Sequence, residues 1–95
     1  MAAVLVFRDK KVKWGLIIEM VVWERDSPLM GCRHRFKCRL VCGRLATGGS
    51  LVRYDNEMGK GVLRHAGDVE QSYTFTDLEK LFTDFEKDVR EVLKR

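Results

Sequence analysis

The stretch TDLEKLFTDFEKDVREVLKR, residues 76–95, has the spacing of a single long amphipathic helix. Its apolar residues recur at intervals of three and four and form one stripe, which consists of Leu78, Leu81, Phe82, Phe85, Val89, Val92 and Leu93. Thr76 is followed three residues later by Glu79, the pattern of a capping box, so the helix is predicted to begin at Thr76. Because such a stripe must be buried, the rest of the chain has to provide the surface on which the helix packs.

The residues before the helix have the composition of β-strands. Residues 3–7 form a short apolar run that the charged sequence RDKK ends or turns. Residues 15–24 are apolar on both alternating faces, which is typical of a central strand. Residues 51–56 are predicted to form a further strand after the glycine-rich hairpin connection GRLATGGS, and the sequence SYTFT adds a short final strand before the helix.

Residues 34–42 alternate in character and assign their side chains to two faces of a sheet. One face carries His34, Phe36, Cys38, Leu40 and Cys42. The other carries Arg35, Lys37 and Arg39, which lie opposite the helix and are candidates to bind nucleic acid. A chain of 95 residues has room for one core. We therefore expect a single α+β domain over residues 1–95, an antiparallel meander of four to five strands with one long C-terminal helix packed on one face.

The net charge of +4 conceals an asymmetry along the chain. Residues 1–65 contain thirteen Lys and Arg and six Asp and Glu, a net charge of +7. Residues 66–95 contain five and eight of these residues, respectively, a net charge of −3. A basic body with an acidic tail favours a polyanion as the partner of the first part, and an ordinary solvated surface is the alternative.

The sequence also bears on location and cofactors. The longest apolar run, residues 16–23, is interrupted by Glu19 and is far shorter than the roughly 20 residues that span a bilayer. No basic stretch precedes the first apolar run as in a signal peptide, so we expect a cytoplasmic protein without membrane contact. The odd number of cysteines favours reduced thiols. Cys38 and Cys42 are about 13 Å apart on a strand, too far to share a zinc ion, so no metal or other cofactor is predicted.

The stretch LVRYDNEMGKGVLRH, residues 51–65, concentrates polar side chains of several kinds around one turn. Lys60 lies between two glycines, which allow a ligand to approach the backbone closely. On the strand before the turn, Arg53 and Asp55 share one face, and Tyr54 and Asn56 share the other. Three functions are represented in the stretch: phosphate binding by Arg53, Lys60 and Arg64, orientation of a hydroxyl by Tyr54, Asp55 and Asn56, and proton transfer by His65.

These groups suit metal-free cleavage of RNA, in which a 2′-hydroxyl loses a proton, the leaving 5′-oxygen gains one, and negative charge builds up around phosphorus. Histidine transfers protons near neutral pH, and Lys and Arg stabilise the developing charge. His34 is either a second proton-transfer group or a histidine at the edge of the core. The alternative for the whole stretch is a turn with surface ion pairs, in a protein that binds nucleic acid or a partner without catalysis.

The motifs HRFKCRLVC, VRYDNEMGKGVLRH and YTFTDLEKLFTDFEKDV resemble the TumE family of small prokaryotic toxins, and the likeness extends over nearly the whole chain. The resemblance implies a toxin that pairs with a helix-turn-helix antitoxin and has a RelE-like endoribonuclease activity on RNA, either free or on the ribosome. It also implies self-association of the toxin. The implied functional set is Arg53, Tyr54, Asp55, Lys60, Arg64 and His65. In the family the position before Arg64 is often histidine, whereas here it is Leu63.

Overall fold

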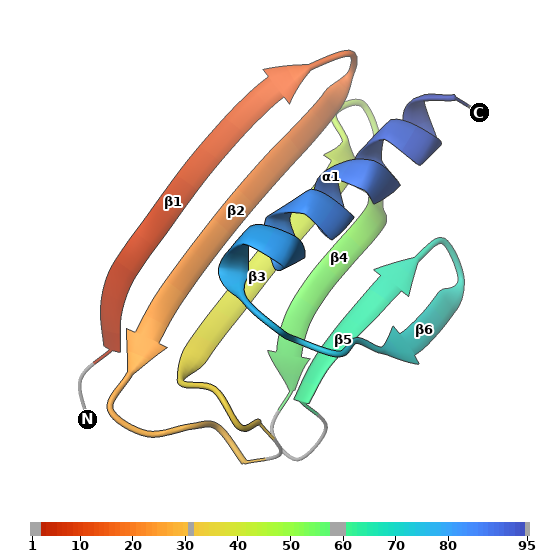
Figure 1. Cartoon of the computed structure of the whole chain (residues 1–95). Helices are drawn as coiled ribbons and strands as arrows, with labels where there is room; N and C mark the ends of the chain where they lie inside the picture. The colour runs from red at the N-terminus through yellow and green to blue at the C-terminus, as the bar shows by residue number, and fades with distance from the viewer. Residues whose placement is uncertain (1–2, 31, 58–60, 95) are drawn as a thin grey trace.

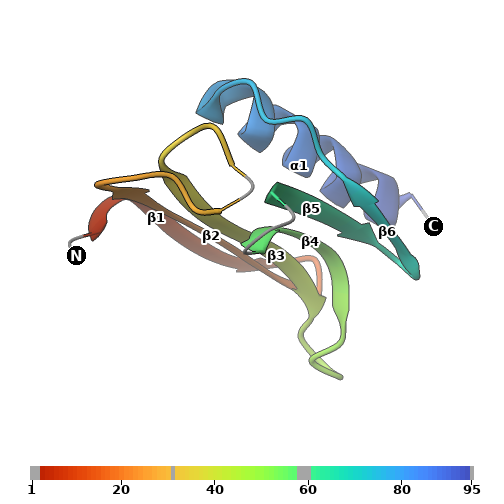
Figure 2. The ribbon, with the colours of Figure 1, turned by 90° about the horizontal axis from the view of Figure 1, so that it is seen from below.

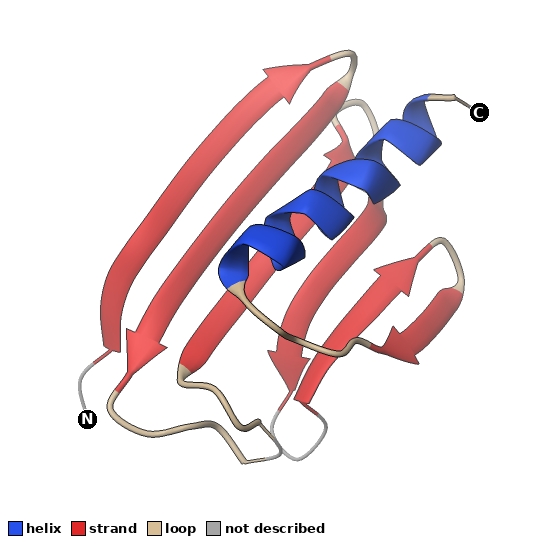
Figure 3. Cartoon of the chain, in the orientation of Figure 1, coloured by secondary structure: helices blue, strands red, loops and turns tan. Residues whose placement is uncertain are grey.

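The computed structural model describes residues 3–30, 32–57 and 61–94 of the chain, with Glu57 described by its backbone alone. Six antiparallel strands form one sheet in sequence order, and a single helix follows them (Figure 1). The elements are β1 (Ala3–Lys13), β2 (Leu16–Arg25), β3 (Phe36–Arg44), β4 (Ser50–Glu57), β5 (Gly61–Ala66), β6 (Val69–Ser72) and α1 (Leu78–Leu93). The expected α+β meander with a C-terminal helix is confirmed, and the sheet has six strands instead of four to five (Figure 3).

The first hairpin is longer than the sequence suggested. The prediction that RDKK ends or turns the first strand is wrong, because β1 pairs with β2 from Ala3 to Lys13. The turn consists of Trp14 and Gly15, both with positive φ, at 56° and 73°. Two central residues with positive φ are the requirement of the type I′ turn, whose twist matches that of the flanking strands.

The last strands also differ from the prediction. β5 and β6 form a hairpin closed by the loop of Gly67 and Asp68, with Ala66 opposite Val69. Gly67 has a φ of 62°, a value that favours glycine at the first position of such a loop. The expected strand SYTFT is not formed, because Ser72 is the last residue of β6 and residues 73–77 connect the sheet to the helix.

The helix begins one residue later than the capping box predicted. The N-cap is Asp77 rather than Thr76, and the Asp77 side chain accepts a hydrogen bond of 2.8 Å from the backbone N–H of Lys80. A carboxylate at this position satisfies a free N–H and interacts favourably with the helix dipole, which explains why Asp77 is preferred.

The helix packs on one face of the sheet and forms the second layer of the domain (Figure 2). Leu81, Phe85 and Val89 of α1 are buried in the core, whereas Leu93 remains 40% exposed. The sheet contributes alternate side chains to the same core: Leu16, Ile18, Met20, Val22, Cys38, Leu40, Cys42, Val52, Tyr54 and Val62. The predicted apolar stripe is therefore confirmed except at its C-terminal end.

Among the described residues, no helix lies on the opposite face of the sheet, and we call it the helix-free face. The strand register defines two rows of side chains across it. One row runs from β1 to β6 through Lys10, Glu19, Val41, Arg53, His65 and Glu70. The next runs through Arg8, Val21, Arg39, Asp55, Leu63 and Ser72. Within the described part of the chain, no helix has the length and apolar character needed to cross a membrane.

Candidate functional site

The sheet divides the predicted functional set between its two faces. Arg53, Asp55 and His65 lie on the helix-free face, where the register places Arg53 directly opposite His65. Tyr54 and Arg64 face α1 and are opposite each other. Lys60, which sequence reasoning also included, lies outside the described residues. The described members of the set therefore form two clusters rather than one.

The helix-free cluster is centred on the imidazole of His65. Arg53 Nη2 lies 3.2 Å from His65 Nε2, a distance at which the guanidinium can donate to an unprotonated ring nitrogen. Glu70 on β6 approaches the same atom, with its Oε1 3.3 Å from Nε2. A carboxylate only accepts hydrogen bonds, so this second contact is favourable when Nε2 carries a proton. The cluster can thus hold His65 in either protonation state.

Glu70 was missed by the sequence reasoning, although a signal for it exists. The residue lies on β6, and that strand was not predicted. The dipeptide Gly67-Asp68 is a hairpin signal. A two-residue loop at that point sets Glu70 opposite His65.

Asp55 extends the cluster toward β3. Its Oδ2 atom lies 3.5 Å from Arg53 Nε, and its neighbour across the sheet is Leu63, which is buried. Arg53 Nε and Asp55 Oδ1 are buried without a hydrogen-bond partner in the described part of the chain. These two unsatisfied polar atoms make the Arg53–Asp55 pair the incompletely hydrogen-bonded part of the cluster.

Two of the predicted nucleic-acid-binding residues, Lys37 and Arg39, lie on β3 and share the helix-free face with this cluster, whereas Arg35 precedes β3. Arg35, Lys37 and Arg39 are exposed, as the alternation predicted, and Arg39 is opposite Asp55 in the register. Arg39 pairs with Glu19 at 3.5 Å, and Arg35 pairs with Glu24 at 3.6 Å. Exposed ion pairs of this kind are worth about 0–1 kcal/mol, so a phosphate can replace the carboxylate as the partner at little cost.

The second cluster ties the sheet to the helix. Arg64 makes two hydrogen bonds to Asp88 of α1, Nε to Oδ2 at 2.7 Å and Nη2 to Oδ1 at 2.9 Å. Tyr54 OH also donates to Asp88 Oδ2 and accepts from Arg64 Nε at 3.1 Å. These bonds occupy Arg64 and join β4, β5 and α1, so their direct effect is to dock the helix.

The electrostatics of this second cluster agree with a structural role. Burial raises the pKa of Asp88, but the hydrogen bonds from Arg64 and Tyr54 outweigh it and leave the pKa below its usual value. Burial and the hydrogen bond to Asp88 raise the pKa of the Tyr54 hydroxyl well above its usual range. Tyr54 is therefore a neutral hydroxyl and Asp88 a carboxylate at physiological pH. No local pattern in the sequence indicates Asp88, because its partners Tyr54 and Arg64 lie on strands far from it in the chain.

Asn56 contacts the backbone, and His34 contacts the backbone and aromatic side chains, as expected for residues with a structural role. Asn56 is buried, and its Oδ1 atom accepts from the backbone N–H of Cys38 at 2.7 Å, while its Nδ2 atom donates to the carbonyl of Phe36 at 3.1 Å. His34 stacks on Phe75 with ring centroids 3.9 Å apart, and its Nδ1 accepts from the Phe36 N–H. Burial lowers the pKa of His34. These contacts do not bring His34 to the His65 cluster.

The cysteines are free thiols, with Cys38 and Cys42 buried in the core. Burial raises the pKa of Cys38 to about 12, so it is a neutral thiol at physiological pH. Within residues 3–30, 32–57 and 61–94, no group of three or more His, Cys, Asp or Glu side chains is arranged to hold a metal ion.

The sequence was compared with protein-family models, curated proteins and solved structures. A family model described as toxin TumE matches residues 4–93, which is nearly the whole chain. No curated protein and no solved structure matches the chain. The matched range includes β1 from its second residue, all of β2 to β6 and the whole of α1.

Proposed function

The chain belongs to the TumE family of toxins from toxin–antitoxin systems, and we propose that this toxin is a metal-independent endoribonuclease whose site is the Arg53–His65 pair. The observation that carries the proposal is the 3.2 Å contact between the Arg53 guanidinium and the His65 imidazole on a face that no helix covers. An anion binder beside a proton-transfer group is the minimum that RNA cleavage requires. An open sheet face also leaves room for a long, flat substrate.

The reaction follows from the roles of the two side chains. The phosphate of the substrate takes Arg53 as its partner, which frees His65 Nε2 to accept the proton of the 2′-hydroxyl. The 2′-oxygen then forms a bond to phosphorus, and the bond from phosphorus to the 5′-oxygen breaks. The products are a 2′,3′-cyclic phosphate and a 5′-hydroxyl, whose proton comes from solvent. Arg53 stabilises the extra negative charge on the phosphate oxygens in the transition state.

The neighbouring charges support this assignment. Once His65 carries the proton, Glu70 at 3.3 Å becomes a favourable partner for the imidazolium. Arg39 lies on the same face of the sheet, opposite Asp55. Lys37 lies two residues before Arg39 on β3 and therefore faces the same side. Phosphates on either side of the scissile bond can contact these cations. Sequence-independent binding of this kind is expected to weaken as salt increases.

We further propose, from the family resemblance, that the partner is a helix-turn-helix antitoxin and that the toxin acts in the cytoplasm, where its RNA substrate is found. Tyr54 and Arg64 enter this proposal as positioning residues, because their bonds to Asp88 hold β4 and β5 against the helix. They keep Arg53 and His65 in register without touching the substrate.

Growth inhibition and RNA cleavage in the presence of EDTA test the proposal. His65→Ala is expected to lower the cleavage rate by about 10²–10⁴, the usual cost of losing a general base. Arg53→Ala is expected to cost about 10²–10³, as for other donors to a charged transition state. Lys60→Ala is tested in the same growth-inhibition and RNA-cleavage assays. Arg44→Ala removes an exposed guanidinium at the end of β3 and serves as the matched control.

Two results would contradict the proposal. Cleavage that disappears with EDTA and returns with a divalent ion would mean that a metal performs the chemistry. Equal activity of the His65, Arg53 and Arg44 variants would move the site away from the helix-free face. If RNA binds to this face but is not cleaved, free or on translating ribosomes, the protein is a nucleic-acid-binding module without catalysis.

A further inference from the structure

The sheet has two edges of very different character. β6 is a short edge strand of four residues, whereas β1 at the other edge has eleven and pairs only with β2 (Figure 1). In β1 all residues except Asp9 are exposed. A long exposed edge has a row of unpaired backbone N–H and C=O groups that can pair with another strand.

The β1 edge has an apolar half and a basic half. Val4, Leu5, Val6 and Phe7 are 61%, 51%, 44% and 37% exposed, four consecutive apolar residues at the surface. The following residues, 8–13, contain four cations and one carboxylate, a net charge of +3. Exposed runs of apolar residues are avoided in soluble domains unless they serve a function.

The protective features of this edge are incomplete. The register shift between Leu5 and Phe7 and the lysines after them are the usual devices against unwanted strand pairing. The lysines, however, protect only the second half of β1. Lys11 pairs with Asp9 at 3.5 Å and Lys13 lies over the Trp14 ring at 4.1 Å, both at exposed positions where such contacts are weak.

We propose that the outer edge of β1 binds an extended segment of the antitoxin, which adds a seventh strand to the sheet with acidic side chains opposite residues 8–13 and apolar side chains opposite residues 4–7. Backbone hydrogen bonds to the edge supply affinity, and the charge pattern supplies specificity. This inference rests on membership of the toxin family and not on the nuclease proposal.

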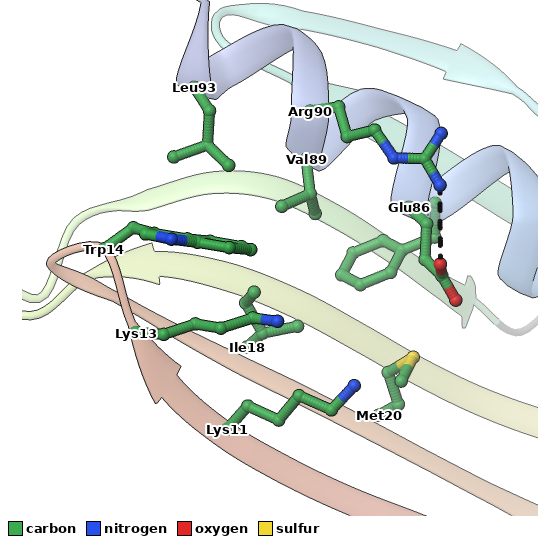
Figure 4. A pocket seen from close by; sticks show the side chains of 10 residues that line it. Lys11, Lys13, Trp14, Ile18, Met20, Glu86, Val89, Arg90 and Leu93 are labelled. Carbon is green, nitrogen blue, oxygen red and sulfur yellow. Dashed lines mark ion pairs between the residues drawn. The ribbon is translucent and has the colours of Figure 1, made fainter.

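The groove behind β1 adds a second contact for such a segment. It has a volume of about 170 Å³ and lies between α1 and the β1–β2 hairpin, with Ile18 and Met20 on its sheet wall and Val89 on its helix wall (Figure 4). Lys11 and Lys13 line the groove on the side of β1. Acidic side chains on the helix side of the added strand would meet these two lysines.

A second copy of this chain fits the edge poorly. An antiparallel pair of two complete β1 strands would place Arg8 opposite Arg8 and the lysines opposite the apolar half of the partner strand. A shifted pairing that matches the apolar halves would leave both basic halves without partners. Only a segment with an acidic half complements the whole edge.

Hydrogen exchange of the toxin, alone and with its cognate antitoxin, tests the proposal on the unmodified protein. The outward-facing amides of β1 are expected to exchange at least about tenfold more slowly in the complex. The amides of β6, the other edge, are the internal control and should change little.

Charge reversal provides the second arm. Lys11→Glu with Lys13→Glu is expected to raise the Kd for the antitoxin by roughly 10–100-fold. Both residues face the helix side, so growth inhibition by the variant should persist while the antitoxin no longer relieves it. Lys87→Glu with Lys94→Glu on α1 introduces the same charge change away from the edge and should be neutralised like the wild type.

Three outcomes would overturn the inference. The first is that the β1 amides exchange at the same rate in the complex as in the free toxin. The second is that the two double variants bind the antitoxin with equal Kd. The third is that the β1 amides of the toxin alone become more protected as its concentration rises, which would indicate that a second copy binds the edge. Exchange and Kd measurements need no toxicity, so they decide the docking site even if the nuclease proposal fails. If the β1 variant is unfolded by circular dichroism, the exchange experiment on the unmodified complex still decides.

Discussion

Arg53 Nη2 lies 3.2 Å from His65 Nε2, and Glu70 Oε1 lies 3.3 Å from that same nitrogen on a neighbouring strand. The guanidinium can only donate and the carboxylate can only accept, so Arg53 is a favourable neighbour of Nε2 without a hydrogen and Glu70 of Nε2 with one. A proton that arrives on His65 weakens its contact with Arg53 and strengthens the one with Glu70. This arrangement suits the proposed reaction, in which Arg53 leaves His65 to bind the substrate phosphate and His65 then accepts a proton.

This relationship predicts a modest effect of Glu70→Gln. The Glu70 side chain is half exposed, and exposed ion pairs contribute about 0.2–1 kcal/mol. The cleavage rate should therefore fall about twofold to fivefold, measured with RNA in EDTA, and Glu86→Gln on α1 serves as the control. A loss of a hundredfold or more would show that Glu70 itself transfers a proton.

The link between helix and sheet predicts a large effect of Asp88→Asn on stability. Asp88 and Arg64 are mostly buried and make two direct hydrogen bonds, so removing the charge leaves a guanidinium without its partner. Hydrogen bonds to charged groups contribute roughly 1.5–3 kcal/mol, and we expect the free energy of unfolding to fall by about 2–3 kcal/mol in urea titrations. Asp77→Asn, which alters the exposed N-cap, should cost far less. Equal losses would argue that the pair contributes little.

The same contact predicts the pH dependence of stability. The pKa of Asp88 is lower in the folded than in the unfolded protein, so its stabilisation is present above the ordinary pKa of about 3.9 and lost as the pH falls through the folded value. Melting temperatures should decline below about pH 4, and less steeply in Asp88→Asn. The hydrogen bonds from Lys80 and Tyr73 also lower the pKa of Asp84, so the variant keeps part of the decline. Parallel curves for the two proteins would contradict this assignment.

Asn56 is predicted to be structural and not catalytic. Replacement by Ala removes the acceptor for the Cys38 N–H and the donor to the Phe36 carbonyl, both in the buried region between β3 and β4. A buried polar group left without a partner costs about 1–3 kcal/mol, so Asn56→Ala should destabilise the fold by roughly 2–4 kcal/mol. The RNase activity of the folded fraction should be unchanged. A folded, inactive variant would instead place Asn56 in the site.

Helix docking can be tested at two phenylalanines that differ in burial. Phe85 is fully buried, and Phe85→Ala should cost about 3–5 kcal/mol. Phe82 is only partly buried and contacts the Phe7 ring at 5.0 Å between centroids, so Phe82→Ala should cost clearly less. Denaturant unfolding of both variants measures the difference. Unchanged stability of both would mean that α1 is not docked as described.

Local periodicity was sufficient for much of the fold. The period of two in residues 34–42 separated Arg35, Lys37 and Arg39 from the core, and the helical stripe identified the buried face of α1. Both inferences succeed because side-chain direction within one element depends only on that element's own geometry. Errors occurred at element ends, where RDKK continued as a strand and Asp77 replaced Thr76 as the cap, and in the last hairpin, where β6 was missed and SYTFT formed no strand.

The composition of the site was decided by contacts between elements. The sequence placed Arg53 and Tyr54 on opposite faces of one strand, but it could not say which face α1 would cover or which residues of later strands would meet them. His65 meets Glu70 only through the register of β5 and β6, and Tyr54 meets Asp88 across 34 positions of sequence. Hydrogen-bond partners so far apart depend on how the strands pair and where the helix docks, and no local pattern encodes that geometry.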